Sequence, residues 1–390
     1  MTSTRRIYLD NNATTPVLPD VVDAMRPYFG ERFGNASSIH QHGQDTRSAV
    51  ERARASVAAL VGCRPSEIVF TSGGTEADNL AIAGLVKAGD HIITSSIEHH
   101  AVLFSSKHLQ DTGIEVTYLP VDGRGLVDPE DVRRAICPNT KLISVMMANN
   151  ETGVVQPVEE IGKIAAEAGV LFHTDAVQAV GKIPVDVKNI GCHALSLSGH
   201  KLHGPQGVGA LYLKKGTQIQ PLFYGGRHER SRRAGTENVP GIVGLGKAAE
   251  LAMQGFADGA EKKMAELRDR LQRGILSEVE EAGVNGEGAP RVPNTTNIYF
   301  SHIEGESMVI ALDLKGLAIS TGAACASGAI EASHVLTAMG LRGDRPRGSI
   351  RFSLGKQNTA EDIDFALALV PSVVERLRDL SPDYKAVGLK

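Results

Sequence analysis

Between residues 67 and 213, short apolar runs alternate with amphipathic segments, and this alternation limits the fold more than any other feature of the sequence. Seven runs have the length and apolar content of buried strands: EIVFTS, HIITSS, EVTYLP, KLISVMM, VLFHTD, ALSLSG and GALYL. Segments between them, such as VEEIGKIAAEAG, have the periodicity of helices. The pattern predicts an α/β fold with a mostly parallel seven-stranded sheet and helices on both faces.

The character of the sequence changes after about residue 255. We expect a long charged helix over AEKKMAELRDRLQRGILSEVEEAG, strands over TTNIYF and SIRFSL, and a last helix over AEDIDFALALVPSVVERLRDL. This order indicates a smaller α+β domain beside the larger sheet. We therefore predict a large domain of residues 15–255 and a small domain formed by residues 1–14 and 256–390.

Charge and apolar content narrow the classes of function. The 41 Lys and Arg residues nearly balance the 45 Asp and Glu residues, and the formal charge of −4 argues against direct binding of nucleic acid or of an acidic membrane. The N-terminal residues lack the apolar core of a signal peptide, and the longest apolar runs are too short to cross a bilayer. Four scattered cysteines, without the spacing of a disulfide framework or a zinc site, favour a reducing cytoplasm.

Two polar residues stand where predicted strands end. Lys201 comes just after ALSLSG, and Asp175 ends VLFHTD, 26 residues earlier. Ligands of parallel sheets bind at the carboxyl ends of the strands, where a buried lysine can form a Schiff base and a carboxylate can pair with a pyridine nitrogen. Taken alone, each residue also has a structural interpretation, as a lysine that extends to the surface and as an aspartate that caps a helix.

Other strand ends carry groups suited to a phosphate-bearing ligand. EIVFTSGGTEADN predicts a strand, a glycine turn and a helix, and the helix N–H groups near Gly74 and Thr75 form an anion site. His99 follows the next strand and is suited to ring stacking or proton transfer, although an isolated histidine is more often structural. Asn150 follows a later strand and is suited either to a ligand or to a turn.

Considered together, these residues follow successive strands of one sheet. They supply a phosphate site, a side chain for ring stacking, an acid and a lysine. That set matches the needs of pyridoxal 5′-phosphate, which a protein must hold in place and tune through its ring. The pattern therefore predicts a site for this cofactor.

Nine short motifs, in order along the chain, resemble those of the cysteine desulfurases of the NifS/IscS type, which are fold-type I pyridoxal-phosphate enzymes of the class-V aminotransferase family. They are YLDNNATTP, GNASSIH, TSGGTEADN, EHHAV, NNETG, HTDAVQAVGK, SGHKLHGPQGVG, RRAGTEN and IRFSLG. The resemblance extends from about residue 7 to about residue 380, which is nearly the whole chain.

The resemblance implies a role for each residue at the predicted site. Lys201 would hold the cofactor as a Schiff base, Asp175 would pair with the ring nitrogen, and Gln178 would pair with the ring hydroxyl. His99 would stack on the ring and transfer protons. The residues that would contact the phosphate or its surroundings are Gly74, Thr75, Ser198, Gly199 and His200, with Thr236 contributed by the second subunit of a homodimer.

The substrate implied by the resemblance is L-cysteine. Asn150 and Arg351 would orient its carboxylate, and Asn150 would also lie against the cofactor. In this family a loop of small residues carries the nucleophilic cysteine, which Cys325 in STGAACASG matches. Its thiolate would take sulfur from L-cysteine as a persulfide and release L-alanine. Many relatives have SGSAC where this chain has TGAAC, so Ala323 replaces a serine.

The sulfur acceptor implied by the resemblance is an iron–sulfur scaffold protein. No metal is expected in the isolated enzyme, although Cys325 would serve as a transient iron–sulfur ligand shared with the scaffold. RRAGTEN and the cysteine loop are closer to the nitrogen-fixation branch, so nitrogenase maturation is one destination for the sulfur.

Two other functions remain open. The same fold would suit a selenocysteine lyase or an aminotransferase, and an aminotransferase needs no nucleophilic thiol. A degenerate homologue that only docks assembly proteins is the second alternative. Retention of Lys201, Asp175, His99 and Cys325 argues against such a scaffold.

Overall fold

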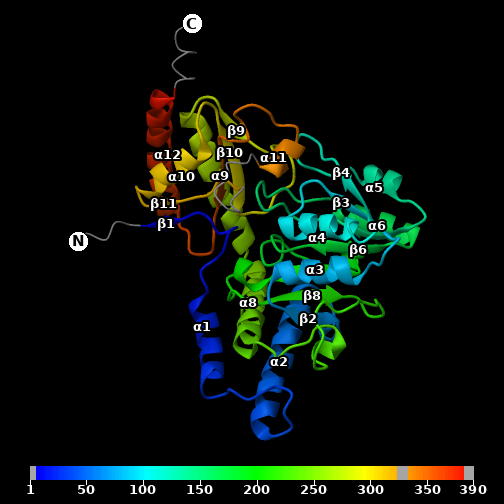
Figure 1. Ribbon diagram of the computed structural model, residues 1–390. Coiled ribbons are helices and arrows are strands. Elements are labelled where there is room, and N and C mark those ends of the chain that lie inside the picture. The colour runs from blue at the N-terminus through cyan, green and yellow to red at the C-terminus, as the bar shows by residue number, and fades with distance from the viewer. Residues whose placement is uncertain (1–5, 323–332, 382–390) are drawn as a thin grey trace.

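The computed structural model describes residues 6–322 and 333–381, and its larger part is built on a seven-stranded sheet (Figure 1). In order across the sheet the strands are β2 (Ile68–Thr71), β8 (Gly209–Leu213), β7 (Ala194–Ser198), β6 (Leu171–Asp175), β5 (Thr140–Ser144), β3 (His91–Ser95) and β4 (Glu115–Leu119). Every neighbouring pair is parallel except the two made by β8. The predicted fold is therefore confirmed, and the carboxyl ends of β3, β5, β6 and β7 lie at one edge of the sheet.

Helices cover both faces of this sheet because successive side chains of each strand point to opposite sides. In β3, Ile93 joins the apolar core beneath α2 (Gln41–Leu60), α6 (Val158–Ala168) and α8 (Val239–Ala257). Its neighbour Ile92 joins the core on the other face, beneath α3 (Gly74–Gly84) and α4 (His100–Gln110). Burial on both faces explains why the strands are continuous apolar runs.

A second group of elements has its own apolar core around a three-stranded antiparallel sheet. Its strands are β9 (Ala282–Val284), β10 (Thr295–Phe300) and β12 (Ser349–Ser353), and its helices are α9 (Ala260–Glu278), α10 (Gly305–Asp313) and α12 (Ala360–Leu380). Ile7 and Leu9 also belong to this core, and β1 (Ile7–Tyr8) pairs with β11 (Leu317–Ala318). Figure 1 shows this group at the end of the molecule where both chain termini lie.

The remaining helices are short and connect these elements. They are α1 (Pro19–Met25), α5 (Pro129–Ala135), α7 (Val187–Ile190) and α11 (His334–Ala338). Across residues 6–322 and 333–381, none of the helices combines the length and the apolar content needed to cross a bilayer.

The long charged helix differs from its prediction at the C-terminal end. We expected the helix to continue to Gly283, but α9 ends at Glu278 and Ala282–Val284 forms β9. The backbone turns at Glu281, which has a φ of 49°, and β9 then pairs with β10. Pairing with a strand distant in sequence therefore overrides the helical pattern of this segment.

Candidate active site

Lys201 lies at the carboxyl edge of the sheet, in the single 3₁₀ turn Gly199–Lys201 that follows β7. Its side chain is half-buried, and its Nζ donates hydrogen bonds to the main-chain oxygens of Asn12 and of Ala13, the latter at 2.7 Å. The lysine therefore turns inward toward the N-terminal segment instead of extending to the surface. Thr15 also belongs to this contact, because its N–H and Oγ1 both donate to the main-chain oxygen of His200.

Asp175 ends β6, the strand beside β7, and is buried. Its Oδ1 accepts a hydrogen bond of 2.8 Å from the N–H of Val177, so one carboxylate oxygen is held by the turn that follows the strand. Burial raises the pKa of Asp175 to about 6, while the Val177 N–H and the positive charge of Lys201 act in the opposite direction. A cationic partner at this carboxylate would favour its ionised form.

Gln178 is buried three residues after Asp175 and makes two polar contacts. Its Nε2 donates to the main-chain oxygen of Asn12 at 3.1 Å, and its Oε1 accepts from Lys182 Nζ at 2.6 Å. Lys182 also donates to Asn12 Oδ1 at 2.7 Å. Asn12 therefore contacts Gln178, Lys182 and Lys201, a cluster that the sequence alone did not reveal.

The N-terminus of α3 lies beside Ser198, at the end of β7. A Cβ placed on Gly74 would come within 2.7 Å of Val177 Cγ2 and 3.5 Å of Ser198 Cβ, so only glycine permits this close packing. At Gly73, by contrast, an added Cβ would meet no atom within 4 Å. Gly73 is the N-cap of α3 and provides no side-chain cap, so the start of the helix, with Thr75 in its first turn, is open to an anion.

His99 caps the N-terminus of α4 after β3. Its Nδ1 accepts a hydrogen bond of 3.1 Å from the N–H of Ala101, which places the proton of the neutral ring on Nε2. Burial and, to a smaller degree, the charge of Lys201 lower the pKa of His99 to about 4. The ring is therefore neutral near pH 7, with an N–H on the side away from the helix.

His200 and Lys201 are adjacent in the sequence, and His200 is half-buried. Its Nδ1 lies 3.1 Å from Thr14 Oγ1. Burial, followed by the charges of Lys201 and Lys182, lowers the pKa of His200 to about 4.

Arg351 and Asn150 contact each other at the same edge, although they come from different apolar cores. Arg351 lies on β12 and donates through Nη1 to the main-chain oxygen of Asn150 at 2.9 Å, and through Nη2 to Asp10 Oδ1 at 2.7 Å. Within the described part of the chain, Arg351 Nε and Asn150 Oδ1 are buried without a hydrogen-bond partner. A buried guanidinium with an unused N–H is suited to a ligand carboxylate.

Thr236 lies apart from these residues, in a cavity lined also by Thr71 and Ser72 at the far side of the glycine turn. The segment before it contains three successive non-glycine residues of positive φ, Glu229–Ser231, at 44°, 58° and 65°. Buried Arg54 holds this segment through two hydrogen bonds of 2.7 Å to the Glu229 carboxylate. Cys325, the predicted nucleophile, lies outside the described residues.

Two buried acids at this edge received no role from the sequence. Glu98 follows β3, and its Oε1 accepts hydrogen bonds from Ser95 Oγ at 2.5 Å and from the N–H of Met146 at 2.9 Å. Burial, and to a smaller degree the charge of Asp175, raise the pKa of Glu98 to about 8 against these two hydrogen bonds. Burial also raises the pKa of Asp78 on α3, and the charge of Asp175 adds to this effect. The EHH and EAD motifs contain both acids, but only the fold shows that they are buried.

The class-V aminotransferase family model matches residues 7–365. The chain belongs to this family. The use of pyridoxal phosphate as cofactor is a general property of class-V aminotransferases. The family resemblance stated from the sequence motifs is therefore confirmed.

Among curated class-V relatives, a protein named cysteine desulfurase IscS from Methanosarcina thermophila is 52% identical over 385 residues, which are 98% of this chain and 95% of that protein. A protein of the same name from Dictyoglomus turgidum is 49% identical over 385 residues, covering 98% of this chain and 97% of that protein.

Among solved structures, a NifS-like protein has a TM-score of 0.88 at 39% identity, and the match covers 95% of this chain and 100% of that chain. A structure titled SspA in complex with cysteine has a TM-score of 0.78 at 38% identity, covering 89% of this chain and 98% of that chain.

Proposed function

We propose that this class-V family member is a cysteine desulfurase, a sulfurtransferase that converts L-cysteine to L-alanine and leaves the sulfur on Cys325. The observation that carries the choice of reaction is the likeness, over nearly the whole chain, to relatives named cysteine desulfurase. A neighbour described as a complex with cysteine supports the substrate. The site geometry alone would also suit an aminotransferase.

The residues at the carboxyl edge of the sheet fit pyridoxal phosphate. The open start of α3 suits its phosphate, the buried carboxylate of Asp175 suits a protonated ring nitrogen, and the inward-turned amine of Lys201 suits its aldehyde. We infer that these groups hold the cofactor, with Gln178 at the ring hydroxyl and Ser198, Gly199 and His200 beside the phosphate. When bound, pyridoxal phosphate supplies an electron sink for the carbon skeleton of the amino acid.

The chain's own residues would bind and orient the substrate. Arg351 Nε and Asn150 Oδ1 are buried polar atoms without a partner among the described residues, and we infer that Arg351 and Asn150 orient the substrate carboxylate, with the Arg351 guanidinium as its donor. Arg351 is held by Asp10 and by the Asn150 main chain, so its Nε–H is fixed in direction. Such a fixed donor orients the substrate without a further loss of side-chain freedom.

His99 and Cys325 would carry out the proton and sulfur transfers. The neutral ring of His99 holds a proton on Nε2 and, having a pKa near 4, gives up its proton readily once charged. The Cys325 thiolate would attack the substrate sulfur: the S–S bond of a persulfide forms, the substrate C–S bond breaks, and the released electron pair stays on carbon. That carbon takes up a proton to give L-alanine.

Replacement of the thiol tests the proposed reaction. We expect Cys325→Ala to lose persulfide formation and to release sulfide from L-cysteine, in the presence of dithiothreitol, at less than about a hundredth of the parental rate. Mass spectrometry of the parent chain after L-cysteine should find one added sulfur on Cys325. A variant that releases sulfide at the parental rate would contradict the persulfide mechanism, and a parent chain that transfers amino groups and releases no sulfide would favour the aminotransferase.

We also propose a homodimer in which Thr236 reaches the cofactor phosphate of the partner subunit. Large apolar side chains are exposed near this loop, including Ile39 at 90% and Tyr224 at 85%. The segment before α2 adjoins the Thr236 loop through Ser37 Oγ and His228 Nδ1, which are 3.4 Å apart. Large apolar side chains exposed in two adjoining segments support a protein interface at this place.

Subunit mixing tests the shared site. Lys201→Ala and Thr236→Val chains should each have little activity, but their mixture should regain activity because a hybrid dimer contains one site with both native residues. The parent chain, taken through the same mixing procedure, is the control for loss of activity during subunit exchange. Activity that stays at the level of the separate variants, despite measured exchange, would contradict the shared site.

Further parts of the proposal concern the surroundings of the enzyme. An iron–sulfur scaffold protein would accept the sulfur, with Cys325 as a transient ligand of the new cluster, and nitrogenase maturation is one destination. Cys63, Cys137 and Cys192 are free thiols, which supports a reducing cytoplasm. We also keep the division into residues 15–255 and residues 1–14 with 256–390, which the two apolar cores support.

A further inference from the structure

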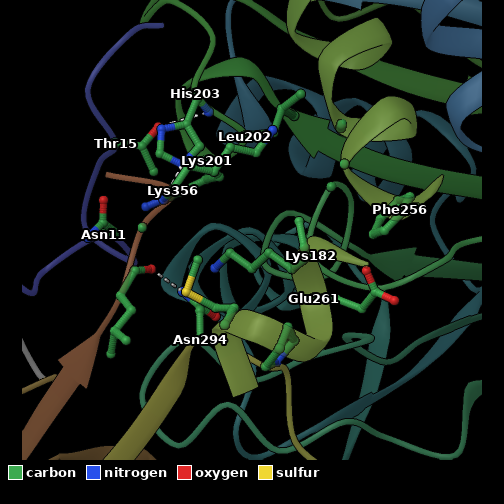
Figure 2. Close-up of a pocket in the computed structure, with 18 residues that line it drawn as sticks. Asn11, Thr15, Lys182, Lys201, Leu202, His203, Phe256, Glu261, Asn294 and Lys356 are labelled. Atoms are coloured by element: carbon green, nitrogen blue, oxygen red, sulfur yellow. Dashed lines mark hydrogen bonds between the residues drawn. The ribbon is translucent and has the colours of Figure 1, made fainter. Parts of the chain in front are cut away.

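Lys182 is a half-buried lysine close to Lys201 that the proposed reaction does not use. It lines the pocket shown in Figure 2, together with Lys201, Lys356 and Asn294. This cavity has a volume of about 60 Å³, which is room for a few water molecules and too little for a cofactor. Lys182 therefore lies beside Lys201 in a cavity that is too small to hold the cofactor itself.

The Lys182 amine contacts two side-chain oxygens. Its Nζ lies 2.6 Å from Gln178 Oε1 and 2.7 Å from Asn12 Oδ1. Burial, followed by the charges of Lys201 and Arg351, lowers the pKa of Lys182. The donors needed for these two contacts are present in either protonation state, because an ammonium has three N–H groups and a neutral amine has two.

These contacts determine which end of the Gln178 amide faces the cofactor site. An amide has one oxygen that accepts and one nitrogen that donates. The oxygen of Gln178 is taken by Lys182, and its nitrogen donates to the main-chain oxygen of Asn12 at 3.1 Å. Because Nε2 carries two hydrogens, one remains for a further acceptor. A rotated amide would place its N–H groups against the lysine and its oxygen against the Asn12 carbonyl, and both contacts would be lost.

Asn12 is fixed in the same way. Its Oδ1 accepts from Lys182 and from Asn294 Nδ2 at 3.1 Å, and its Nδ2 donates to Thr295 Oγ1 at 2.9 Å. Every side-chain polar atom of Asn12 therefore has a partner of the matching kind. The main-chain carbonyl that accepts the hydrogen bond from Gln178 Nε2 therefore belongs to a residue, Asn12, that is itself held in place by hydrogen bonds.

We propose that Lys182 is a positioning residue that holds Gln178 by its oxygen and so directs the amide N–H to the ring oxygen of the cofactor. This inference rests on the proposed function only in requiring pyridoxal phosphate at the site, and it does not require cysteine as the substrate. Lys182 acts through Gln178, so its removal matters only while Gln178 is present.

A double-mutant cycle tests this dependence. The variants are Lys182→Met, Gln178→Leu and the double variant, and the measurement is the equilibrium dissociation constant of pyridoxal phosphate for each apoprotein, without substrate. We expect about a tenfold weaker binding in each single variant and less than about a threefold further loss in the double variant. Independent effects that multiply to about a hundredfold would overturn the proposal, since Lys182 would then act by its charge alone.

Two further variants separate positioning from general damage. Lys182→Arg keeps N–H donors at this place and should bind the cofactor within about threefold of the parent. Lys356→Met removes an exposed lysine at the same cavity, whose Nζ donates to the Leu251 main chain at 3.3 Å, and should bind the cofactor within about twofold of the parent. An equal loss in Lys356→Met and Lys182→Met would contradict a specific role.

Folding and the wider function are checked independently. Thermal unfolding of each apoprotein, read by circular dichroism, shows whether a variant is folded, and Lys182→Leu, which also lacks N–H donors, replaces the methionine variant in the cycle if that variant is not. The proposed desulfurase fails if the parent binds the cofactor but forms no L-alanine from L-cysteine. The Lys182 proposal is still decided in that case, because the cycle uses the cofactor alone.

Discussion

Strand β3 begins at one histidine, His91, and leads at its carboxyl end to another, His99, and the two rings differ in their polar contacts. His91 begins the strand, and its ring nitrogens lie 2.9 Å from Thr140 Oγ1 and 2.9 Å from Thr117 Oγ1. His99 lies four residues past the other end, where, within residues 6–322 and 333–381, Nδ1 is the one ring nitrogen with a hydrogen-bond partner, the N–H of Ala101. Burial lowers the pKa of both rings, but the positive charge of Lys201 acts on His99 alone.

The difference extends from the two rings to their surroundings. At the amino end, neighbouring strands supply a matching hydroxyl for each nitrogen of His91. At the carboxyl edge, by contrast, buried polar atoms lack partners among the described residues, namely Glu98 Oε2, Asn150 Oδ1 and Arg351 Nε. Unpaired buried groups cost free energy, so a protein retains them where a ligand completes them. The contrast indicates that polar residues stabilise the fold at the amino edge and are available to a ligand at the carboxyl edge.

Removal of Lys201 should produce the largest effect at the carboxyl edge. We expect Lys201→Ala to lose the visible absorbance of the bound cofactor and to reduce L-alanine formation by more than about a thousandfold. Thr140→Val, at the amino edge, removes a hydroxyl that contacts His91 and should change turnover by less than about twofold. Unchanged turnover in Lys201→Ala would refute the assignment of the site.

The two histidines can be compared directly by the same substitution. His99→Gln should lower turnover by about 10²- to 10⁴-fold, because it removes the proposed proton carrier. His91→Gln should leave turnover nearly unchanged but reduce the free energy of unfolding by about 1 kcal/mol, because the half-buried hydroxyls of Thr117 and Thr140 lose their partner. Steady-state kinetics and urea unfolding measure the two quantities. Equal losses of turnover in both variants would remove the distinction between the edges.

The smallest expected effect at the carboxyl edge concerns Glu98, and it is measured as the pH dependence of the free energy of unfolding. Its pKa rises from an ordinary 4.5 to about 8 on folding, so the folded chain keeps a proton that the unfolded chain releases between these values. The free energy of unfolding therefore falls as the pH rises from about 4.5 to about 8. Glu98→Gln should remove this contribution and flatten the fall, as measured by urea unfolding at several pH values. Parallel curves for the parent and the variant would contradict the raised pKa.

The strands of the sheet could be predicted from the sequence because each one is encoded by a short, continuous stretch of residues. Each core strand is a short apolar run bounded by polar residues, and Lys201 and Asp175 stand directly after two of them. The end of α9 could not be predicted, because β9 exists only through pairing with β10.

The roles of Asn12 and Lys182 could not be predicted for a similar reason. Asn12 contacts Lys201, 189 residues away, and Thr295, 283 residues away, so no local pattern reports these contacts. Both residues lie in motifs that identified the family, YLDNNATTP and HTDAVQAVGK, but a motif match does not show which atoms meet. Their functions follow only from the hydrogen bonds.

The pairing of the first residues with the last strands has a consequence for synthesis of the protein on the ribosome. β1 pairs with β11, and Asn12 N–H donates to Ser353 Oγ, 341 residues away. The segment Ile7–Asn12 cannot take its native place before the ribosome has also made Ser353. A product truncated before β12 would lack both Arg351 and the Ser353 contact that holds Asn12 beside Lys201, so the site would stay incomplete until β12 has been made.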